Sequence, residues 1–93
     1  MPVVDQQKAD VLNRLSRIEG QVRGVKRLVE NETYCVEVLT QVSAIHEALR
    51  AAGKIIMRSH LEHCVTDALR RGDPEEAERI YREMMDVIFK FAK

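Results

Sequence analysis

Apolar residues in the first third of the chain recur at alternating steps of four and three. They are Val11, Leu15, Ile18, Val22, Val25 and Val29. This spacing puts all of them on one face of an α-helix, in the heptad pattern of helices that pack against other helices. The pattern predicts a helix over about residues 5–30, which ends at residues 31–33, because their side chains compete for backbone hydrogen bonds.

The same alternation predicts a second and much longer helix. Its apolar positions are Val38, Val42, Ile45, Leu49, Ala52, Ile56, Leu61, Val65, Ala68 and Leu69. Thr33 is the predicted N-cap, and Gly72 is the expected left-handed residue after the last helical residue, Arg71. Gly53 interrupts the pattern, but one glycine costs a helix only about 1 kcal/mol. Because the helix is far longer than average, a large partner surface must bury its apolar face.

A third helix starts after residues 72–76. Asp73 is the predicted N-cap, Pro74 the first helical residue, and two glutamates follow where the helix dipole favours negative charge. The apolar face of this helix consists of Ala77, Ile80, Tyr81, Met84, Ile88 and Phe91. Three helices of such unequal length cannot bury the long central face within one chain. We therefore expect an all-α fold: a three-helix protomer with a long central helix, assembled as a helix-bundle homo-oligomer.

Composition narrows the class of protein. Ninety-three residues are expected to form a single domain, 1–93. The sequence contains neither an apolar run of about 18 residues nor a signal peptide, so we expect no membrane span and a cytoplasmic location. The two cysteines are then expected to be reduced thiols rather than a disulfide. Paired carboxylates, a nucleophile with its base and a phosphate-binding loop are all missing, so an enzyme is not expected.

The net charge of zero conceals local differences. Six basic residues accompany two acidic ones in residues 8–27, whereas residues 73–86 contain six acidic and two basic ones. Arg50, Lys54 and Arg58 recur every four residues and form a stripe opposite the apolar face of the central helix. Repeated in an oligomer, this stripe can contact the phosphates of duplex DNA, although a solvated helix face has the same pattern. The helices are too long for a helix-turn-helix.

Three residues can carry chemistry: Cys35, His60 and Cys64. In an α-helix His60 and Cys64 lie one above the other, and Cys35 lies within about 20° of both in projection. Cys35 and His60 are 25 residues apart, or about 37 Å along one helix, which no metal ion spans. Either the helix folds back near Gly53, or the ligands come from two chains. The unbroken apolar pattern favours two antiparallel chains with a two-fold axis near residues 48–49.

Two thiolates and one imidazole form a soft set of three donors. Copper(I) accepts three ligands, whereas structural zinc usually takes four, so the set favours Cu(I). The alternative is that both cysteines are small semi-buried hydrophobic residues and that His60 is an ordinary packing residue. His46 and His63 are expected to have packing or solvent-facing roles, and a place for His63 as a fourth ligand stays open.

Three segments resemble the copper-sensitive operon repressor family. They are residues 14–25 (RLSRIEGQVRGV), residues 34–36 (YCV) and residues 59–64 (SHLEHC). The resemblance extends over essentially the whole chain. It implies an all-α dimer of dimers, a homotetramer, that binds double-stranded operator DNA as a repressor. It also implies that Cu(I) binds between protomers and releases the DNA, so that copper efflux or resistance genes are derepressed.

The resemblance also assigns individual residues. It implies that Cys35, His60 and Cys64 hold Cu(I), that Tyr34 and Glu83 lie next to these ligands, and that Arg14 contacts the operator. Arg50 and Lys54 are DNA contacts that we add from the basic stripe.

The family contains sensors of other inducers. Nickel and cobalt sensors have an additional histidine near the N-terminus or in the first helix, and no histidine precedes His46 here. Persulfide sensors lack the histidine that His60 matches. A formaldehyde-responsive repressor would use Pro2, Cys35 and His60, all present, but its pattern lacks Cys64. We expect Cu(I), with a formaldehyde-responsive repressor and a copper- or zinc-buffering protein without DNA function as alternatives.

Overall fold

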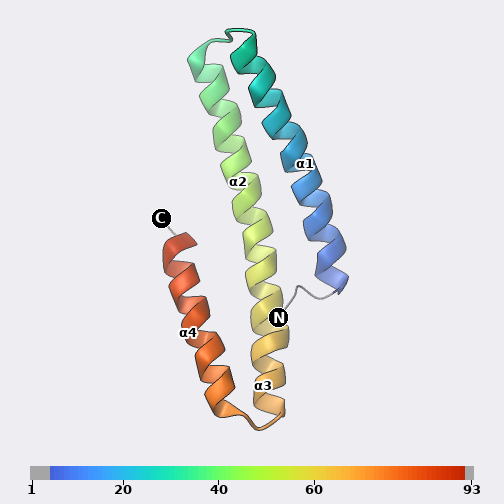
Figure 1. Ribbon diagram of the computed structural model, residues 1–93, viewed down its shortest axis with the longest axis vertical. Coiled ribbons are helices and arrows are strands. Elements are labelled where there is room, and N and C mark those ends of the chain that lie inside the picture. The colour runs from blue at the N-terminus through green and yellow to red at the C-terminus, as the bar shows by residue number, and fades with distance from the viewer. Residues whose placement is uncertain (1–4, 92–93) are drawn as a thin grey trace.

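The computed structural model describes the backbone of residues 5–91 and the side chains of residues 7–90. Within that range the chain is helical, in the order α1 (Asp5–Glu30), α2 (Cys35–Ser59), the π-helical segment η1 (His60–Val65), α3 (Thr66–Arg70) and α4 (Pro74–Phe91). α2, η1 and α3 follow one another without a break and form one straight element, the central rod (Figure 1). The predicted all-α protomer with a long central helix is confirmed.

The two outer helices pack against different lengths of the central rod. α1 runs antiparallel along α2, and α4 runs antiparallel along η1 and α3 (Figure 1). The molecule is therefore long and flat, with extents of 58 × 27 × 13 Å. No helix of the described part of the chain is apolar enough over a sufficient length to cross a membrane.

The turn between α1 and α2 differs from the prediction. Thr33 donates its backbone N–H to the carbonyl of Leu28 (3.0 Å), and Glu32 donates to that of Val29 (3.1 Å). These two bonds form a Schellman motif that closes α1, with Glu32 in the left-handed conformation (φ 56°). Thr33 was therefore wrongly predicted as the N-cap of the second helix. Tyr34 is the N-cap, and its carbonyl accepts the N–H of Glu37 (3.0 Å).

The turn between α3 and α4 agrees with the prediction. Gly72 is left-handed (φ 70°), and a second Schellman motif joins Asp73 to the carbonyl of Ala68 (3.0 Å). Asp73 caps α4, because its Oδ1 accepts the backbone N–H of Glu76 (3.1 Å). α4 begins at Pro74, which needs no N–H at the first helical position.

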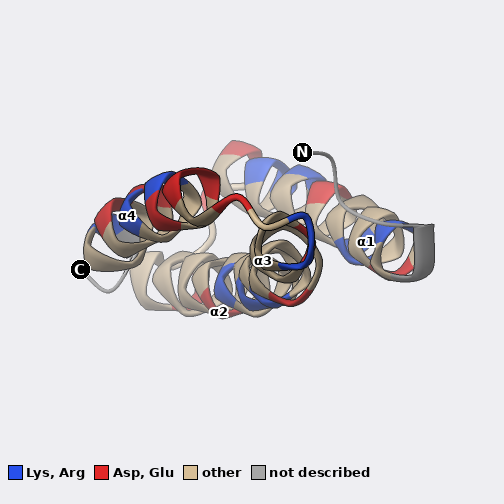
Figure 2. Cartoon of the chain, turned by 90° about the horizontal axis from the view of Figure 1, so that it is seen from below, with Lys and Arg blue, Asp and Glu red and all other residues tan. Residues whose placement is uncertain are grey.

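The core of the chain lies in two places along the rod. Beside α1, the buried residues are Val11, Ile18, Ile45 and Ala52. Beneath α4, a second cluster, the α4 cluster, contains Cys64, Ala68, Ala77, Ile80 and Met84, with Met57 and Val65 packed against it. The rod thus buries one face toward α1 and another toward α4, and the end-on view in Figure 2 shows these helices on opposite sides of it.

The π-helical segment η1 lies where the buried face of the rod changes. Ile45, Ala52 and Ser59 are buried at steps of seven, whereas Cys64 follows after five residues and Ala68 after four more. A π-helix bonds i to i+5 and so takes up one residue more per turn than an α-helix. The sequence predicted an uninterrupted α-helix, and this is wrong over His60–Val65. The extra residue turns Cys64 and Ala68 toward α4.

Much of the predicted apolar face stays exposed in one chain. The exposed large residues of that face include Val22, Val29, Leu49, Ile56, Leu61, Leu69, Tyr81 and Ile88. Leu39 and Phe89, which were not assigned to it, are exposed as well. Phe91, which was assigned to the face of the third helix, has its side chain outside the described range. Monomeric proteins rarely expose so many neighbouring apolar residues. The exposure agrees with an oligomer, which stays a prediction.

Candidate metal centre and DNA-contacting surface

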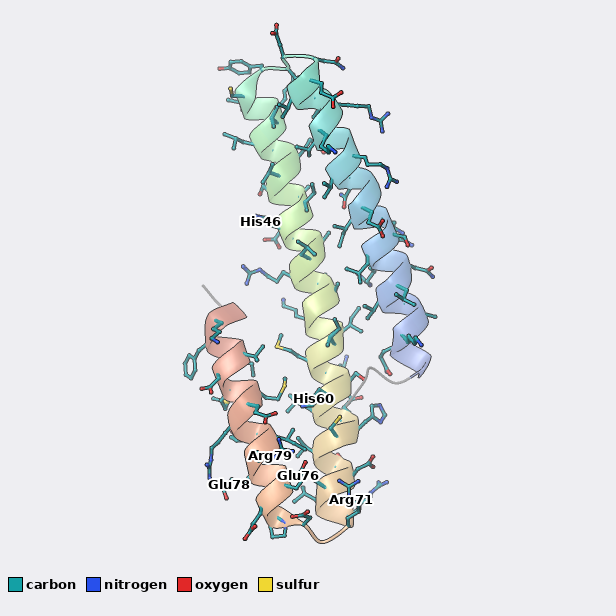
Figure 3. The ribbon with its side chains drawn as sticks, viewed as in Figure 1. His46, His60, Arg71, Glu76, Glu78 and Arg79 are labelled. Carbon is teal, nitrogen blue, oxygen red and sulfur yellow. The ribbon has the colours of Figure 1, made fainter. Side chains whose placement is uncertain are left out.

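The three predicted metal ligands lie at two ends of α2. Cys35 is the first residue of α2 and is exposed, whereas Cys64 lies in η1 and is only 2% exposed. Both cysteines are free thiols. His60 is the first residue of η1, is half-buried, and lies beside α4 (Figure 3).

One chain does not bring these ligands together. Cys35 and His60 are separated by the whole of α2, 25 residues, or about 37 Å at 1.5 Å per residue. Within the described residues, no group of three or more His, Cys, Asp or Glu side chains converges to hold a metal ion. His60 and Cys64 are close in the chain, but they lie in a π-helical turn rather than on the α-helical face that the sequence predicted.

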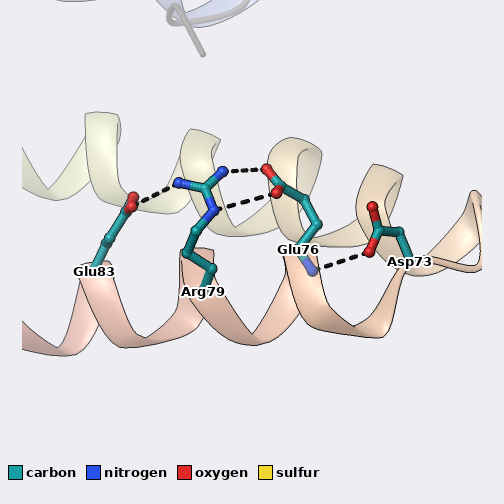
Figure 4. Close-up of polar contacts among 4 residues, drawn as sticks. All are labelled: Asp73, Glu76, Arg79 and Glu83. Atoms are coloured by element: carbon teal, nitrogen blue, oxygen red, sulfur yellow. Dashed lines mark hydrogen bonds and ion pairs between the residues drawn. The ribbon is translucent and has the colours of Figure 1, made fainter.

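Like the predicted ligands, Tyr34 and Glu83 lie in separate parts of the molecule. Tyr34 is exposed and adjoins Cys35, whereas Glu83 lies on α4, the helix that packs against η1. Figure 4 shows that Glu83 accepts a hydrogen bond from Arg79 Nη1 (2.8 Å), and that Arg79 also bonds to Glu76. The hydrogen bond and charge of Glu76, followed by the charge of Glu83, raise the pKa of the Arg79 guanidinium above its ordinary value.

Sequence reasoning missed Arg79 as the partner of Glu83. The signal was present, since Glu76, Arg79 and Glu83 have i, i+3 and i, i+4 spacings that place them in one row on a helix. The carboxylate of Glu83 is therefore already engaged by a cation within α4.

The other two histidines take no part in a cluster among the described residues. His63 is half-buried in η1, and His46 is exposed near the middle of α2, well away from His60 along the rod (Figure 3). Neither position contradicts the packing or solvent-facing roles predicted for them.

The predicted DNA contacts lie on α1 and α2. Arg14 is half-buried and donates to Asp10 Oδ1 (3.1 Å). Lys54 is exposed and Arg50 is half-buried, while Arg58 donates to Glu62 Oε1 (3.0 Å). Exposed pairs of this kind contribute little stability, so their cations can exchange a carboxylate for a phosphate at small cost.

An open hollow of about 240 Å³ adjoins the basic residues of α1. It is lined by Arg14, Arg17, Ile18, Gln21 and Ala48. Figure 2 shows Lys and Arg on α1, on α2 and at the end of α3, whereas Asp and Glu predominate on α4. The polarity inferred from the sequence is thus present in the fold, with a basic α1 and an acidic α4 on opposite sides of the rod.

Comparisons with known proteins agree on one family. Residues 7–90 match the family described as "Metal-sensitive transcriptional repressor". The chain is 45% identical over 87 residues to the copper-sensing transcriptional repressor CsoR of Bacillus subtilis, covering 94% of this chain and 83% of that protein.

Two solved structures are similar to this fold. The copper-sensing repressor CsoR with Cu(I) from Geobacillus thermodenitrificans has a TM-score of 0.86 and 45% identity, covering 100% of this chain and 94% of that one. The nickel-responsive transcriptional regulator InrS has a TM-score of 0.74 and 36% identity, covering 98% of this chain and 97% of that one.

Proposed function

Because this chain belongs to the family of metal-sensitive transcriptional repressors, we propose that it is a Cu(I)-responsive repressor of transcription. It binds double-stranded operator DNA in the absence of metal and leaves the DNA when Cu(I) binds, which derepresses copper efflux or resistance genes. It acts in the cytoplasm, where its operator is, and it is a regulator rather than an enzyme. Residues 1–93 form a single metal-sensing, DNA-binding domain.

The observation that carries this proposal is the separation of soft donors along one straight rod. Cys35 is exposed at one end of α2, and His60 and Cys64 follow its other end. Two rods packed antiparallel place Cys35 of one chain beside His60 and Cys64 of the other, twice per dimer. The exposed apolar residues Leu49 and Ile56 on α2 support such a contact. Two dimers then form the homotetramer.

The donor set fits copper better than nickel. Two thiolates and one imidazole are soft donors, and Cu(I) accepts three of them. The similarity to two copper-sensing repressors supports this choice. A nickel-responsive protein is also similar, but the histidines of this chain are His46, His60 and His63, and α1 contains none.

The switch follows from where the donors lie. Cu(I), when bound, supplies a bond between chains that the thiols and the imidazole cannot make alone. Cys64 lies beneath α4, so drawing Cys35 of the partner toward it moves α4 and shifts one rod along the other. Arg14, Arg50 and Lys54 then lose their register with the phosphates. Allosteric couplings are typically about 1–3 kcal/mol, so several sites of a tetramer must act together.

Titration of Cu(I) against a bound duplex tests the proposal. The duplex is selected from a random library with the metal-free protein, labelled with a fluorophore, and followed by anisotropy under anaerobic conditions with a copper chelator. We expect the anisotropy to fall as one Cu(I) per chain binds. Cys35→Ala and Cys64→Ala should still bind DNA but should not release it when Cu(I) is added, and His46→Ala is the matched control that keeps both properties.

Other outcomes would refute the proposal in distinct ways. Unchanged DNA affinity at saturating Cu(I) would overturn the copper response. Copper binding without selection of any duplex would indicate a copper- or zinc-buffering protein. Release by formaldehyde alone would indicate the formaldehyde-responsive alternative, which depends on Pro2, a residue outside the described range.

A further inference from the structure

The α4 cluster contains more sulfur than Cys64 alone. Met84 on α4 belongs to the same buried cluster and is 7% exposed, and Met57 on α2 packs against it. These are two of the four methionines of the chain. Figure 3 shows sulfur atoms between α4 and the central rod, near the level of His60.

The thiol of Cys64 has no polar partner there. Its side chain is 2% exposed, and within the described residues it makes no hydrogen bond. Its other neighbours in the cluster are Ala68, Ala77 and Ile80, which offer no donor or acceptor. Met57 and Met84 are thus the residues that bring further sulfur atoms to the cluster that contains Cys64.

From this arrangement we infer that Met57, Cys64 and Met84 form a soft-donor site within one chain, which takes a monovalent cation of the Cu(I) or Ag(I) class. The inference rests on the proposed function in one respect, the sharing of Cys64 with the site between chains. Soft thiolate and thioether sulfur selects such ions over harder ones. On binding, the Cys64 S–H bond breaks, the sulfur bonds the cation, and the proton leaves to solvent.

Charge explains why this donor set suits a buried place. An isolated charge is costly to bury. One thiolate neutralises a monovalent cation, and two thioethers complete the coordination without adding charge, so the occupied site is neutral. A second thiolate, as in the site between chains, would leave one negative charge to be compensated. The neutral site holds the ion less firmly and is filled when Cys35 of the partner is not engaged.

The test uses the full chain with Cys35→Ala, which removes the site between chains. The protein is labelled with ¹³C at the methionine methyl groups and titrated with Ag(I), a redox-inert probe. We expect the methyl signals of Met57 and Met84 to shift until one Ag(I) per chain is bound. The signal of Met85, which adjoins Met84 but is not part of the cluster, should stay in place. Unmoved Met57 and Met84 signals would overturn the inference.

Leucine variants give an independent measurement. Leucine has nearly the volume of methionine, so the core should tolerate it. In the Cys35→Ala background, Met57→Leu with Met84→Leu should weaken Ag(I) affinity by about tenfold or more, while Met85→Leu leaves it unchanged. Equal affinities in both variants would refute the site, and if the double variant is unfolded by circular dichroism, the methyl shifts decide.

The outcome is separable from that of the proposed function. If Cu(I) fails to release DNA from the wild type, the methyl shifts in Cys35→Ala are still expected. If the wild type releases DNA but the methyl signals do not move, only the site within one chain is refuted.

Discussion

Cys35 and Cys64 carry the same thiol group but have different surroundings. Cys35 begins α2 and is open to solvent, whereas Cys64 is enclosed between η1 and α4. The sequence predicted both as ligands but not this difference, because the burial of Cys64 depends on the π-helical turn and on the packing of α4. Spacing alone is enough to select a histidine and two cysteines as candidate ligands. It does not predict how accessible each of these side chains is to solvent.

This difference predicts unequal thiol reactivity. In the metal-free protein, iodoacetamide should modify Cys35 rapidly, and Cys64 only as fast as α4 opens locally. Peptide mass spectrometry over a time course measures both rates. Denaturation in urea is the control and should make the rates similar. Equal rates in the native protein would contradict the burial of Cys64.

The proposed binding of phosphates predicts a change in salt dependence. Lys54 is exposed on α2, and its replacement in Lys54→Gln should weaken DNA binding equally for all sequences. The slope of log affinity against log salt should become shallower by about 0.9 for each phosphate that the variant no longer neutralises. Arg82→Gln on the acidic α4 is the matched control and should keep the slope. An unchanged slope in Lys54→Gln would remove this residue from the DNA surface.

At the scale of helices, the two turns use the same motif with different residues. Both are Schellman motifs, with Glu32 in one and Gly72 in the other at positive φ. The second turn could be predicted, because Gly72, Asp73 and Pro74 each have a single preferred position at a helix end. The first could not, since glutamate gives no signal for a left-handed residue. The extra residue of η1 was hidden too, because a long apolar pattern tolerates one step of five.

The two turns predict opposite effects of exchanging their residues. Glu32→Gly should raise the free energy of unfolding by about 1 kcal/mol, because glycine adopts the left-handed conformation without the steric cost of a side chain. Gly72→Ala should lower it by about 1 kcal/mol for the converse reason. An added Cβ at Gly72 would meet no atom within 4 Å, so the backbone alone accounts for the cost.

Urea denaturation at a fixed chain concentration measures both changes, since association also affects stability. Gly24→Ala in the middle of α1, where a Cβ also meets no atom within 4 Å, is the control for helix propensity. A loss of stability in Glu32→Gly would contradict the left-handed turn.

At the scale of the whole molecule, the fold divides the proposed metal site between chains. The all-α class, the three helices and the long rod could be predicted from periodicity, because heptad spacing is a local property of the sequence. The placement of α4 mainly on η1 and α3 could not be predicted, since it depends on the turn at Gly72 and on the change of buried face within η1.

If each metal site takes ligands from two chains, two variants that each lack a ligand should restore a site when they are mixed. Cys35→Ala keeps His60 and Cys64, and Cys64→Ala keeps Cys35, so a mixed antiparallel dimer has one intact site and one empty one. Random mixing makes half of the dimers mixed, which restores about one quarter of the wild-type sites. Counting Cu(I) that resists a strong chelator, after joint refolding, measures this. Neither variant alone should hold Cu(I) against the chelator, and no recovery on mixing would contradict the site between chains.

The packing of α1 and α4 on separate lengths of one rod has a mechanical consequence. Within a chain, a disturbance near Cys64 reaches the arginines of α1 chiefly through bending or torsion of α2. The stiffness of that single helix then sets how much of the disturbance is transmitted. Gly53 is the most compliant point on this route, because glycine restrains the backbone least, and it lies next to Lys54.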